Sequence, residues 1–138
     1  MTEEYAELNR TELLQVYINK CQEANVEPHH HMVNYLDVPE QEERQEEEAL
    51  EIIIQGNLKE NFSSRVTDLD LVCICSAFDQ FAVYIEDIDL RYNEITDEGA
   101  QALADLISKS PRLLGLNLQG NKIKSEGAQY LAEALKEC

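Results

Sequence analysis

The side chains in this sequence that are best suited to chemistry are a run of three histidines and a scattered set of cysteines. His29, His30 and His31 are consecutive, so they point in different directions, and no cysteine or acid accompanies them at metal-ligand spacing. The chain has no other histidine, so a histidine-activated serine or cysteine nucleophile could form only at this corner. The sequence therefore predicts no metal, no cofactor and no catalytic residue.

The four cysteines, at positions 21, 73, 75 and 138, lack the spacing of a disulfide framework. Cys73 and Cys75 are two residues apart on an expected helix, so they diverge around its axis. The chain opens with acidic residues where a secretory signal would be basic, and no apolar run reaches membrane-spanning length. We therefore expect reduced thiols in an intracellular protein of the cytoplasm or nucleus.

The charge of the chain is strongly acidic, because 28 Asp and Glu residues against 11 Lys and Arg residues give a net charge of −17. Such a charge repels nucleic-acid phosphates and anionic lipid headgroups. The excess is densest at residues 40–48, which read either as a solvated stretch or as an attractant for a basic partner. We expect no direct binding to nucleic acid or membranes, and a protein partner with a basic surface.

Two segments, residues 88–104 and 116–132, carry one pattern that repeats after 28 residues. The matching residues are Ile88, Leu90, Asn93, Ile95 and Gly99 in the first copy and Leu116, Leu118, Asn121, Ile123 and Gly127 in the second. A fixed period in the twenties with this spacing is typical of a leucine-rich repeat, in which a strand, a turn and a returning helix form one unit. The predicted fold class is α/β, a right-handed solenoid with parallel strands on a concave face and helices on a convex face.

A degenerate third copy lies upstream, at residues 50–57, and the pattern resumes at residues 66–68. The residues between them, 58–65, read as an insertion in the turn, either a solvated loop or a functional one. The chain is thus divided into an N-terminal region and about three repeats. The predicted boundaries are 1–48 for the region and 49–84, 85–112 and 113–138 for the repeats.

Strand alternation sorts the side chains of the repeats, since every second residue of a strand shares a face. The outward set forms a polar, mildly acidic concave strip with Tyr92 at its edge. The predicted strip consists of Glu51, Ile53, Gln55, Asp87, Asp89, Arg91, Gly115, Asn117 and Gln119. It suits a partner that offers basic and hydrogen-bonding groups, with Tyr92 or Ile53 as anchors.

An asparagine follows each strand, and its amide can satisfy backbone groups that the turn leaves without ladder partners. Asn57, Asn93 and Asn121 are therefore predicted to stack as an internal ladder. The helices are expected to begin at Asp97 and Ser125, both of which are good N-cap types.

Residues 1–48 carry no repeat and are expected to form a helical cap followed by the acidic stretch, because the first repeat of a solenoid would otherwise expose its apolar end. A helix that opens near Thr11 and a second short helix after Pro28 are predicted. Docking onto the repeats is assigned to Leu14, Ile18, Val33 and Leu36. The alternative is an autonomous docking module, separated from the repeats by the acidic stretch.

The 28-residue period, with a Gly-Ala pair near the start of each helix, resembles the ribonuclease-inhibitor type of leucine-rich repeat. This type is also found in Ran GTPase-activating proteins and in innate-immune sensors. The resemblance covers residues 49–138 and implies a curved horseshoe fragment that binds a protein ligand. A structural scaffold subunit, assembled through its helices or its end, stays open as the alternative.

A GTPase activator of the Ran-activator type is a remote third hypothesis that the resemblance adds. Its stabilising arginine would be Arg91, which is the only arginine on a predicted strand. The other roles for Arg91 are a contact on the concave strip or an ion pair with Asp89 or Asp87 on neighbouring strands.

The last repeat closes at the end of the sequence without a unit whose outer face is polar. Its open end would be lined by Leu116, Leu118, Ile123 and Leu131. We expect either further repeats beyond residue 138 or a second chain over this end, and an isolated chain that is marginally stable or self-associates.

Overall fold

The computed structural model describes residues 8–37 and 49–137. The predicted acidic stretch, residues 40–48, lies outside them. In chain order the elements are α1 (Arg10–Glu23), α2 (His30–Leu36), β1 (Leu50–Ile53), η2 (Lys59–Asn61), α3 (Asp68–Phe78), η3 (Asp79–Tyr84), β2 (Ile85–Asp89), α4 (Asp97–Ser108), β3 (Gly115–Asn117) and α5 (Ser125–Leu135). The two η elements are short 3₁₀ helices.

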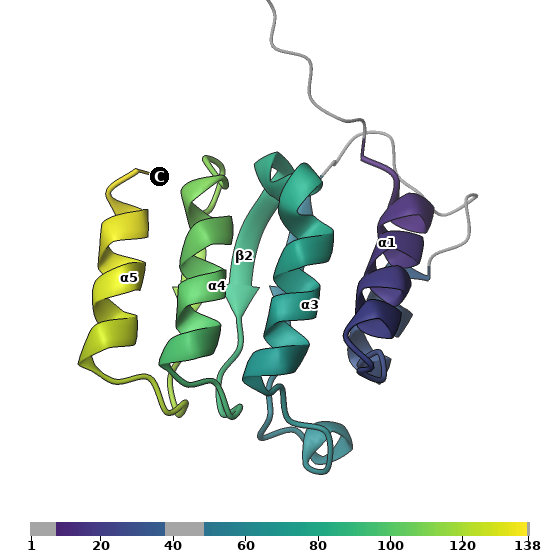
Figure 1. Cartoon of the computed structure of the whole chain (residues 1–138), viewed down its shortest axis with the longest axis horizontal. Helices are drawn as coiled ribbons and strands as arrows, with labels where there is room; N and C mark the ends of the chain where they lie inside the picture. The colour runs from purple at the N-terminus through teal and green to yellow at the C-terminus, as the bar shows by residue number, and fades with distance from the viewer. Residues whose placement is uncertain (1–7, 38–48, 138) are drawn as a thin grey trace, which may run out of the picture.

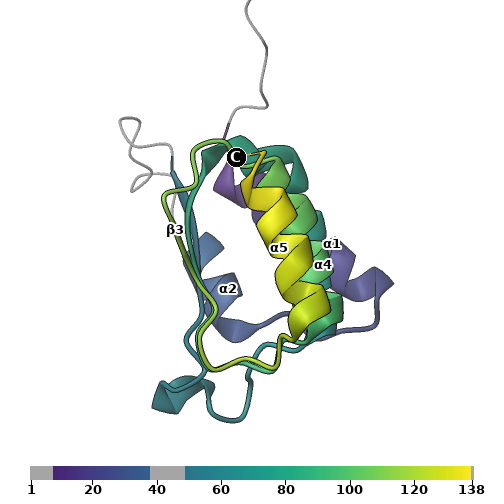
Figure 2. The same cartoon turned by 90° about the vertical axis from the view of Figure 1, so that its left-hand side faces the viewer.

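The strands and the helices form two layers. β1, β2 and β3 make a parallel sheet in that order, and α1, α3, α4 and α5 lie side by side in front of it (Figure 1). Figure 2 shows the sheet and the helices as separate layers joined by turns. The predicted α/β architecture with a parallel sheet is therefore confirmed. In the ranges that the structure describes, no helix combines the length and the apolar character needed to span a membrane.

Equivalent residues of successive repeats are stacked in register. Ile52 pairs with Ile88, and Ile88 pairs with Leu116. The ladder continues past the strands, because the N–H of Ile54 donates to the carbonyl of Asp89 at 2.9 Å. Neighbouring strands lie roughly 4.8 Å apart, so from Glu51 onward, after a register shift at Leu50, each paired strand residue lies next to its counterpart in the following repeat.

The apolar core lies between the two layers and is less complete in the last repeat. Ile88, Leu90 and Ile95 are fully buried. Their counterparts in the last repeat, Leu116, Leu118 and Ile123, are half-buried. Leu131, also expected at the open end, is buried. Because full burial of such a side chain contributes roughly 1.5–3 kcal/mol, the last repeat draws less stability from its own apolar residues than the middle repeat does.

α4 and α5 begin at Asp97 and Ser125, as the sequence predicted, but the assignment of these two residues as N-caps was wrong. Asp97 and Ser125 are the first helical residues, and the N-cap positions are Thr96 and Lys124, neither of which caps with its side chain. Carboxylates of the preceding repeat bond these positions instead. The N–H of Thr96 donates to Oδ1 of Asp68 and the N–H of Lys124 donates to Oδ1 of Asp97, both at 2.7 Å. The capping group therefore comes from the neighbouring repeat.

This arrangement explains the glycine in the first turn of α4. An added Cβ on Gly99 would collide with the Asp68 carboxylate and would lie 2.9 Å from Cγ2 of Ile95. In α5 a Cβ on Gly127 would lie 2.6 Å from Oδ1 of Asp97. Only a residue without a side chain leaves room for the carboxylate that caps from the preceding repeat.

The N-terminal helices contact the first repeat, but not through the whole set of residues that the sequence predicted. α1 packs against α3, with Leu13, Tyr17 and Cys21 buried. In α2 the buried residues are Met32 and Leu36. Of the predicted docking residues, Leu36 is buried, whereas Leu14, Ile18 and Val33 are half-buried. The buried face of α1 thus begins one residue earlier than predicted, at Leu13.

Side chains from α1 and α2 also bond the backbone beside β1. Nη2 of Arg10 donates to the carbonyl of Ala49, and the N–H of Glu51 donates to the hydroxyl of Tyr35, both at 2.9 Å. These bonds cover part of the hydrogen-bonding edge that β1 does not share with β2, and exposed strand edges of this kind promote unwanted pairing.

His29 joins the N-terminal helices to the insertion. Its N–H donates to the hydroxyl of Tyr17 at 2.8 Å, and its Nε2 donates to the carbonyl of Ser64 at 2.5 Å. Its Nδ1 accepts from the N–H of His31 at 3.1 Å. Burial lowers the pKa of His29, although the bond to Ser64 acts in the opposite direction. The histidine run therefore contains a buried, neutral imidazole whose two ring nitrogens are both bonded.

We predict that Gly99→Ala destabilises the chain, because its methyl group would displace the Asp68 carboxylate from the start of α4. The free energy of unfolding should fall by about 1–3 kcal/mol, the usual range for overpacking. Urea denaturation measures the change. Gln101→Ala, at an exposed position of the same helix, is the control and should change stability by less than about 0.5 kcal/mol. Equal stability of Gly99→Ala and the control would contradict the capping account.

We also predict that stability depends on pH through His29. The folded pKa is lowered, so the unfolded chain takes up the proton first as the pH falls, and the free energy of unfolding declines below the ordinary histidine value of 6.5. Denaturation of the wild type and His29→Gln at about pH 8 and about pH 5.5 measures this decline. The variant should show a smaller decline than the wild type. An identical decline in both proteins would assign the pH dependence to other groups.

Candidate functional site

The predicted strip lies on the open face of the sheet, the face that is turned away from the helices. The residues that alternate with it, Ile52, Ile54, Ile88 and Leu90, are buried. The strip residues themselves are exposed or half-buried: Glu51, Ile53, Gln55, Asp87, Asp89, Arg91, Asn117 and Gln119. The register aligns Ile53, Asp89 and Asn117 across the three strands. That these residues bind a partner stays a prediction.

The centre of the strip is a hydrogen-bonded group of three side chains. Nε and Nη2 of Arg91 donate to the two carboxylate oxygens of Asp89, at 3.0 and 2.9 Å. Nε2 of Gln55, on the neighbouring strand, donates to Oδ2 of Asp89 at 2.9 Å. Burial alone would raise the pKa of Asp89, but the hydrogen bonds from Arg91 and Gln55 outweigh it and lower the pKa. Asp89 therefore stays ionised and fixes the guanidinium.

The position of this ion pair refines the sequence prediction. An ion pair between Arg91 and Asp89 was one of the predicted roles, and its 2.9 Å contact is present. The expectation that the acid would come from a neighbouring strand is wrong, because Asp89 ends the strand that leads directly to Arg91. Planar, two-point contact of this kind holds an arginine in one orientation.

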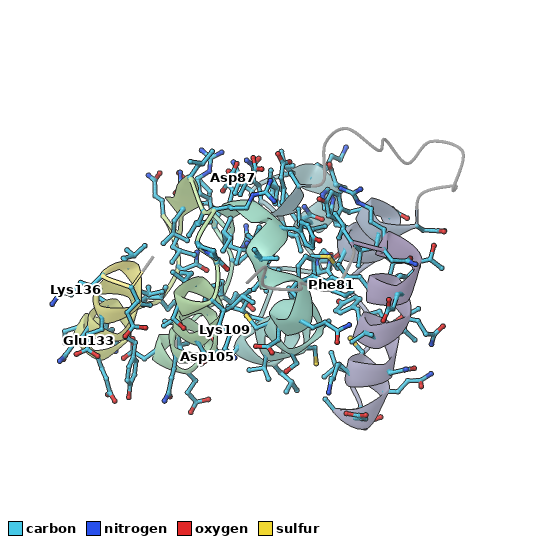
Figure 3. The ribbon with its side chains drawn as sticks, turned by 90° about the horizontal axis from the view of Figure 1, so that it is seen from above. Phe81, Asp87, Asp105, Lys109, Glu133 and Lys136 are labelled. Atoms are coloured by element: carbon cyan, nitrogen blue, oxygen red, sulfur yellow. The ribbon has the colours of Figure 1, made fainter. Side chains whose placement is uncertain are left out.

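Asp87 contributes a carboxylate to the strip beside β3. A Cβ on Gly115 would lie 2.7 Å from Oδ1 of Asp87, so the carboxylate leans over β3 in the space that this glycine leaves. Figure 3 shows Asp87 on the sheet side of the molecule, opposite Asp105 and Lys109 on the helix side. Among residues 8–37 and 49–137, no ion pair engages the Asp87 carboxylate. It is therefore available to a cationic group.

Tyr92 stands at the rim of the strip in an unusual backbone conformation. Its φ is +60°, in the left-handed region, and the same position of the next repeat is Gly120, with φ of +77°. Left-handed geometry costs a residue with a side chain roughly 1–2 kcal/mol. The ring lies over Gly120, where an added Cβ would be 2.8 Å from Cε1 of Tyr92. Tyr92 as a whole is 37% exposed, so a residue with a left-handed backbone is accessible from solvent.

Two of the three predicted ladder asparagines lie where the ladder needs them. Nδ2 of Asn93 donates to the carbonyls of Ile54 (2.7 Å) and Leu90 (3.0 Å), and its Oδ1 accepts from the N–H of Val66 at 2.8 Å. Asn121 repeats the arrangement one unit later, with Nδ2 bonded to the carbonyl of Leu90 at 2.7 Å. Each amide thus joins two consecutive repeats through backbone groups that have no partner in the sheet.

Asn57 does not take this role, which is a correction to the sequence prediction. Asn57 is exposed, whereas Asn61 in the η2 turn is fully buried. Nδ2 of Asn61 donates to the carbonyl of Gln55 at 3.0 Å, and its Oδ1 has no partner within the described part of the chain. The insertion moves the internal asparagine four residues along the chain. A second asparagine inside the predicted insertion was the available signal.

The insertion itself projects from the turn below α3 (Figure 1). Its Phe62 is 56% exposed, and the guanidinium of Arg65 lies 5.5 Å from the centre of the Phe62 ring. Nε of Arg65 donates to the carbonyl of Gly56 at 3.0 Å, which ties the loop to the end of β1. The loop is therefore anchored to the turn after β1, and a functional role for it stays a prediction.

A metal site would need several His, Cys, Asp or Glu side chains close together. Within the ranges covered by the structure, no cluster of three or more His, Cys, Asp or Glu side chains is placed to hold a metal ion. Cys21, Cys73 and Cys75 are buried free thiols. His29 is buried and bonded, as described above. What the open sheet face offers is a fixed arginine–carboxylate pair, a free carboxylate and an aromatic ring.

We predict that the strain at Tyr92 is measurable by comparing two substitutions. Both Tyr92→Gly and Tyr92→Ala remove the ring, but only glycine adopts a positive φ without steric cost. Tyr92→Gly should therefore be more stable than Tyr92→Ala by about 1 kcal/mol, measured by urea denaturation. Equal stabilities would mean that the backbone relaxes out of the left-handed region when the ring is removed.

Comparison with known proteins bears on these repeats. A family model described as leucine-rich repeat matches residues 83–104 and 110–132. These segments contain β2 with most of the helical residues of α4 and β3 with most of α5. No curated protein matches the chain. Because leucine-rich repeats build extended binding surfaces, the matches indicate a protein-protein interaction module. Residues 83–104 and 110–132 thus match the leucine-rich-repeat pattern that the 28-residue period predicted.

Proposed function

We propose that the chain is a non-enzymatic module that binds a protein partner through the open face of its sheet and the adjacent rim. The observation that carries this proposal is Tyr92, which keeps a side chain in a backbone conformation that the next repeat assigns to Gly120. Strained residues persist where the surrounding structure holds them, and they gather at binding sites. A partly exposed tyrosine is also a common anchor in protein interfaces.

The charges of the strip support a basic partner. Arg91 and Asp89 largely neutralise each other, which leaves the carboxylates of Asp87 and Glu51 as the net charge of this face. The net charge of −17 adds a long-range field that steers cationic groups toward the chain. The side-chain amide of Gln55 is held beside the Arg91–Asp89 pair by its hydrogen bond to Asp89. A partner with lysine or arginine near an apolar or aromatic group would match this surface.

The repeats are proposed to form a short right-handed solenoid of the ribonuclease-inhibitor type, with α1 and α2 as its N-terminal cap. The bonds of Arg10 and Tyr35 to the backbone beside β1, and the packing of α1 on α3, support the cap. The buried, free thiols of Cys21 and Cys73 are compatible with the proposed setting inside the cell.

A scaffold subunit is the second candidate, and exposed apolar residues of the last repeat favour it. Leu114 is 86% exposed and Leu135 is 46% exposed. A second copy or further repeats would cover such residues. The GTPase-activator hypothesis receives no such support, because the guanidinium of Arg91 would have to leave Asp89 before it could reach a phosphate.

The test is a binding comparison with a variant that removes the displayed groups but keeps the fold. Tyr92→Gly with Asp87→Asn deletes the ring and the free carboxylate, and glycine suits the backbone at position 92. The control, Glu126→Gln with Gln129→Ala, changes exposed residues of α5 on the helix side. Proteins captured from lysate by the wild type identify the partner, which is then purified and titrated against all three chains.

We predict that the sheet-face variant binds the purified partner with an affinity lower by about 10-fold or more, which is the usual effect of losing one anchor residue. The control should bind like the wild type. Calorimetric titration, after matched thermal melts, measures the affinities. Retained affinity in the sheet-face variant would remove this face from the interface, and a loss in the control alone would favour the scaffold candidate.

A further inference from the structure

The outer face of the helix layer has apolar residues at two positions where the other repeats are polar. On α3, Leu69 is 52% exposed and Val72 is 40% exposed. The equivalent residues are Glu98 and Gln101 on α4 and Glu126 and Gln129 on α5. Asp68, Asp97 and Ser125 open the three helices and fix this alignment. The outer faces of α4 and α5 are thus polar at these two positions, as expected for helices exposed to solvent, whereas the outer face of α3 is apolar there.

A hollow of about 320 Å³ lies next to Val72, between α3 and α4. Cys75, Ala102 and Leu106 line it, and Lys20 of α1 borders it. The residue equivalent to Ala102 on α5 is Tyr130, which is half-buried. At this position, beside the hollow, α4 carries only a methyl group where α5 carries a phenol ring.

Acidic groups border this hollow. Asp79 and Asp105 line it, and Nζ of Lys109 bonds their carboxylates at 2.7 and 3.3 Å. Figure 3 shows Asp105 and Lys109 together on the helix side. All three side chains are about half exposed or more. Two lysines, Lys20 and Lys109, stand against three acids, Asp79, Asp105 and the exposed Glu98 of α4, so the border carries one net negative charge.

We infer that the α3–α4 groove binds an amphipathic helix of a partner protein that carries lysine or arginine beside its apolar face. The groove consists of the hollow, with Val72 and Ala102 in its lining, and of Leu69, which lies one turn before Val72 on α3. Two apolar residues one turn apart match the i, i+3 or i+4 spacing of such a helix. The hollow takes one of its apolar side chains. Basic side chains on its flank face Asp79, Asp105 and Glu98, so the charges complement each other.

This groove is independent of the open sheet face, because it lies on the opposite layer. Its floor is a small set of residues on two adjacent helices, so it needs no movement of the strands. The thiol of Cys75 lies in this floor, and burial raises its pKa. The thiol is therefore neutral and acts as part of an apolar surface.

The test substitutes residues of the α3–α4 groove by those that occupy the equivalent positions in other repeats of the chain. The variant combines Leu69→Glu, Val72→Gln and Ala102→Tyr, the residues at the equivalent positions of α4 and α5, so the fold has precedent for each. Ala102→Tyr alone, which fills the hollow but keeps both apolar residues, is the second variant. The probe is a fluorescein-labelled peptide of about five helical turns, with leucine along one face and lysine on both flanks.

Fluorescence anisotropy should show binding to the wild type and a loss of about 10-fold or more in affinity for the triple variant. Ala102→Tyr should lose part of this affinity. In ¹H–¹⁵N spectra of the wild type, the peptide should shift resonances of Val72, Cys75 and Ala102. A scrambled peptide of the same composition should bind more weakly. Equal binding to wild type and triple variant, equal binding of the scrambled peptide, or shifts confined to Asp87, Arg91 and Tyr92 would overturn the inference.

Discussion

The structure depends on how each repeat satisfies the backbone groups that its turns leave without partners. A strand that bends into a helix cannot pair all of its N–H and C=O groups locally, and buried unpaired groups are costly. Here the partners come from the adjacent repeat. Asn93 joins the ends of two strands, and Asp68 caps the helix of the following unit. No repeat is therefore complete alone, and the register of the sheet follows from these shared bonds.

Stacking in register also determines what the two outer faces display. On the sheet side it aligns Gln55, Asp89 and Arg91 into one bonded group. On the helix side it places each helix next to an equivalent one, so differences between equivalent positions stand out. Tyr92 against Gly120, and Val72 against Gln101, are two such differences. Both proposed binding surfaces are built on such departures from the repeat.

The sequence predicted the parts of the fold that follow from periodicity. The 28-residue spacing located β2, β3, α4 and α5, and it assigned Asn93 and Asn121, because spacing alone places them at the strand ends. It failed where a contact crosses between distant segments. Asn61 replaces Asn57 because an insertion lengthens one turn, and His29 became a buried link because Ser64 lies beside it in space. The left-handed backbone of Tyr92 had a signal in its alignment with Gly120, which the strip prediction did not use.

The central claim is that the open face of the sheet recognises a protein, and hydrogen exchange in the complex tests it most directly. With the captured partner bound, the backbone amides of residues 87–92 and 115–119 should exchange more slowly than in the free chain, and those of α4 and α5 should exchange as before. Protection confined to the outer faces of α3, α4 and α5, with residues 87–92 unchanged, would contradict the claim and assign recognition to the helix layer.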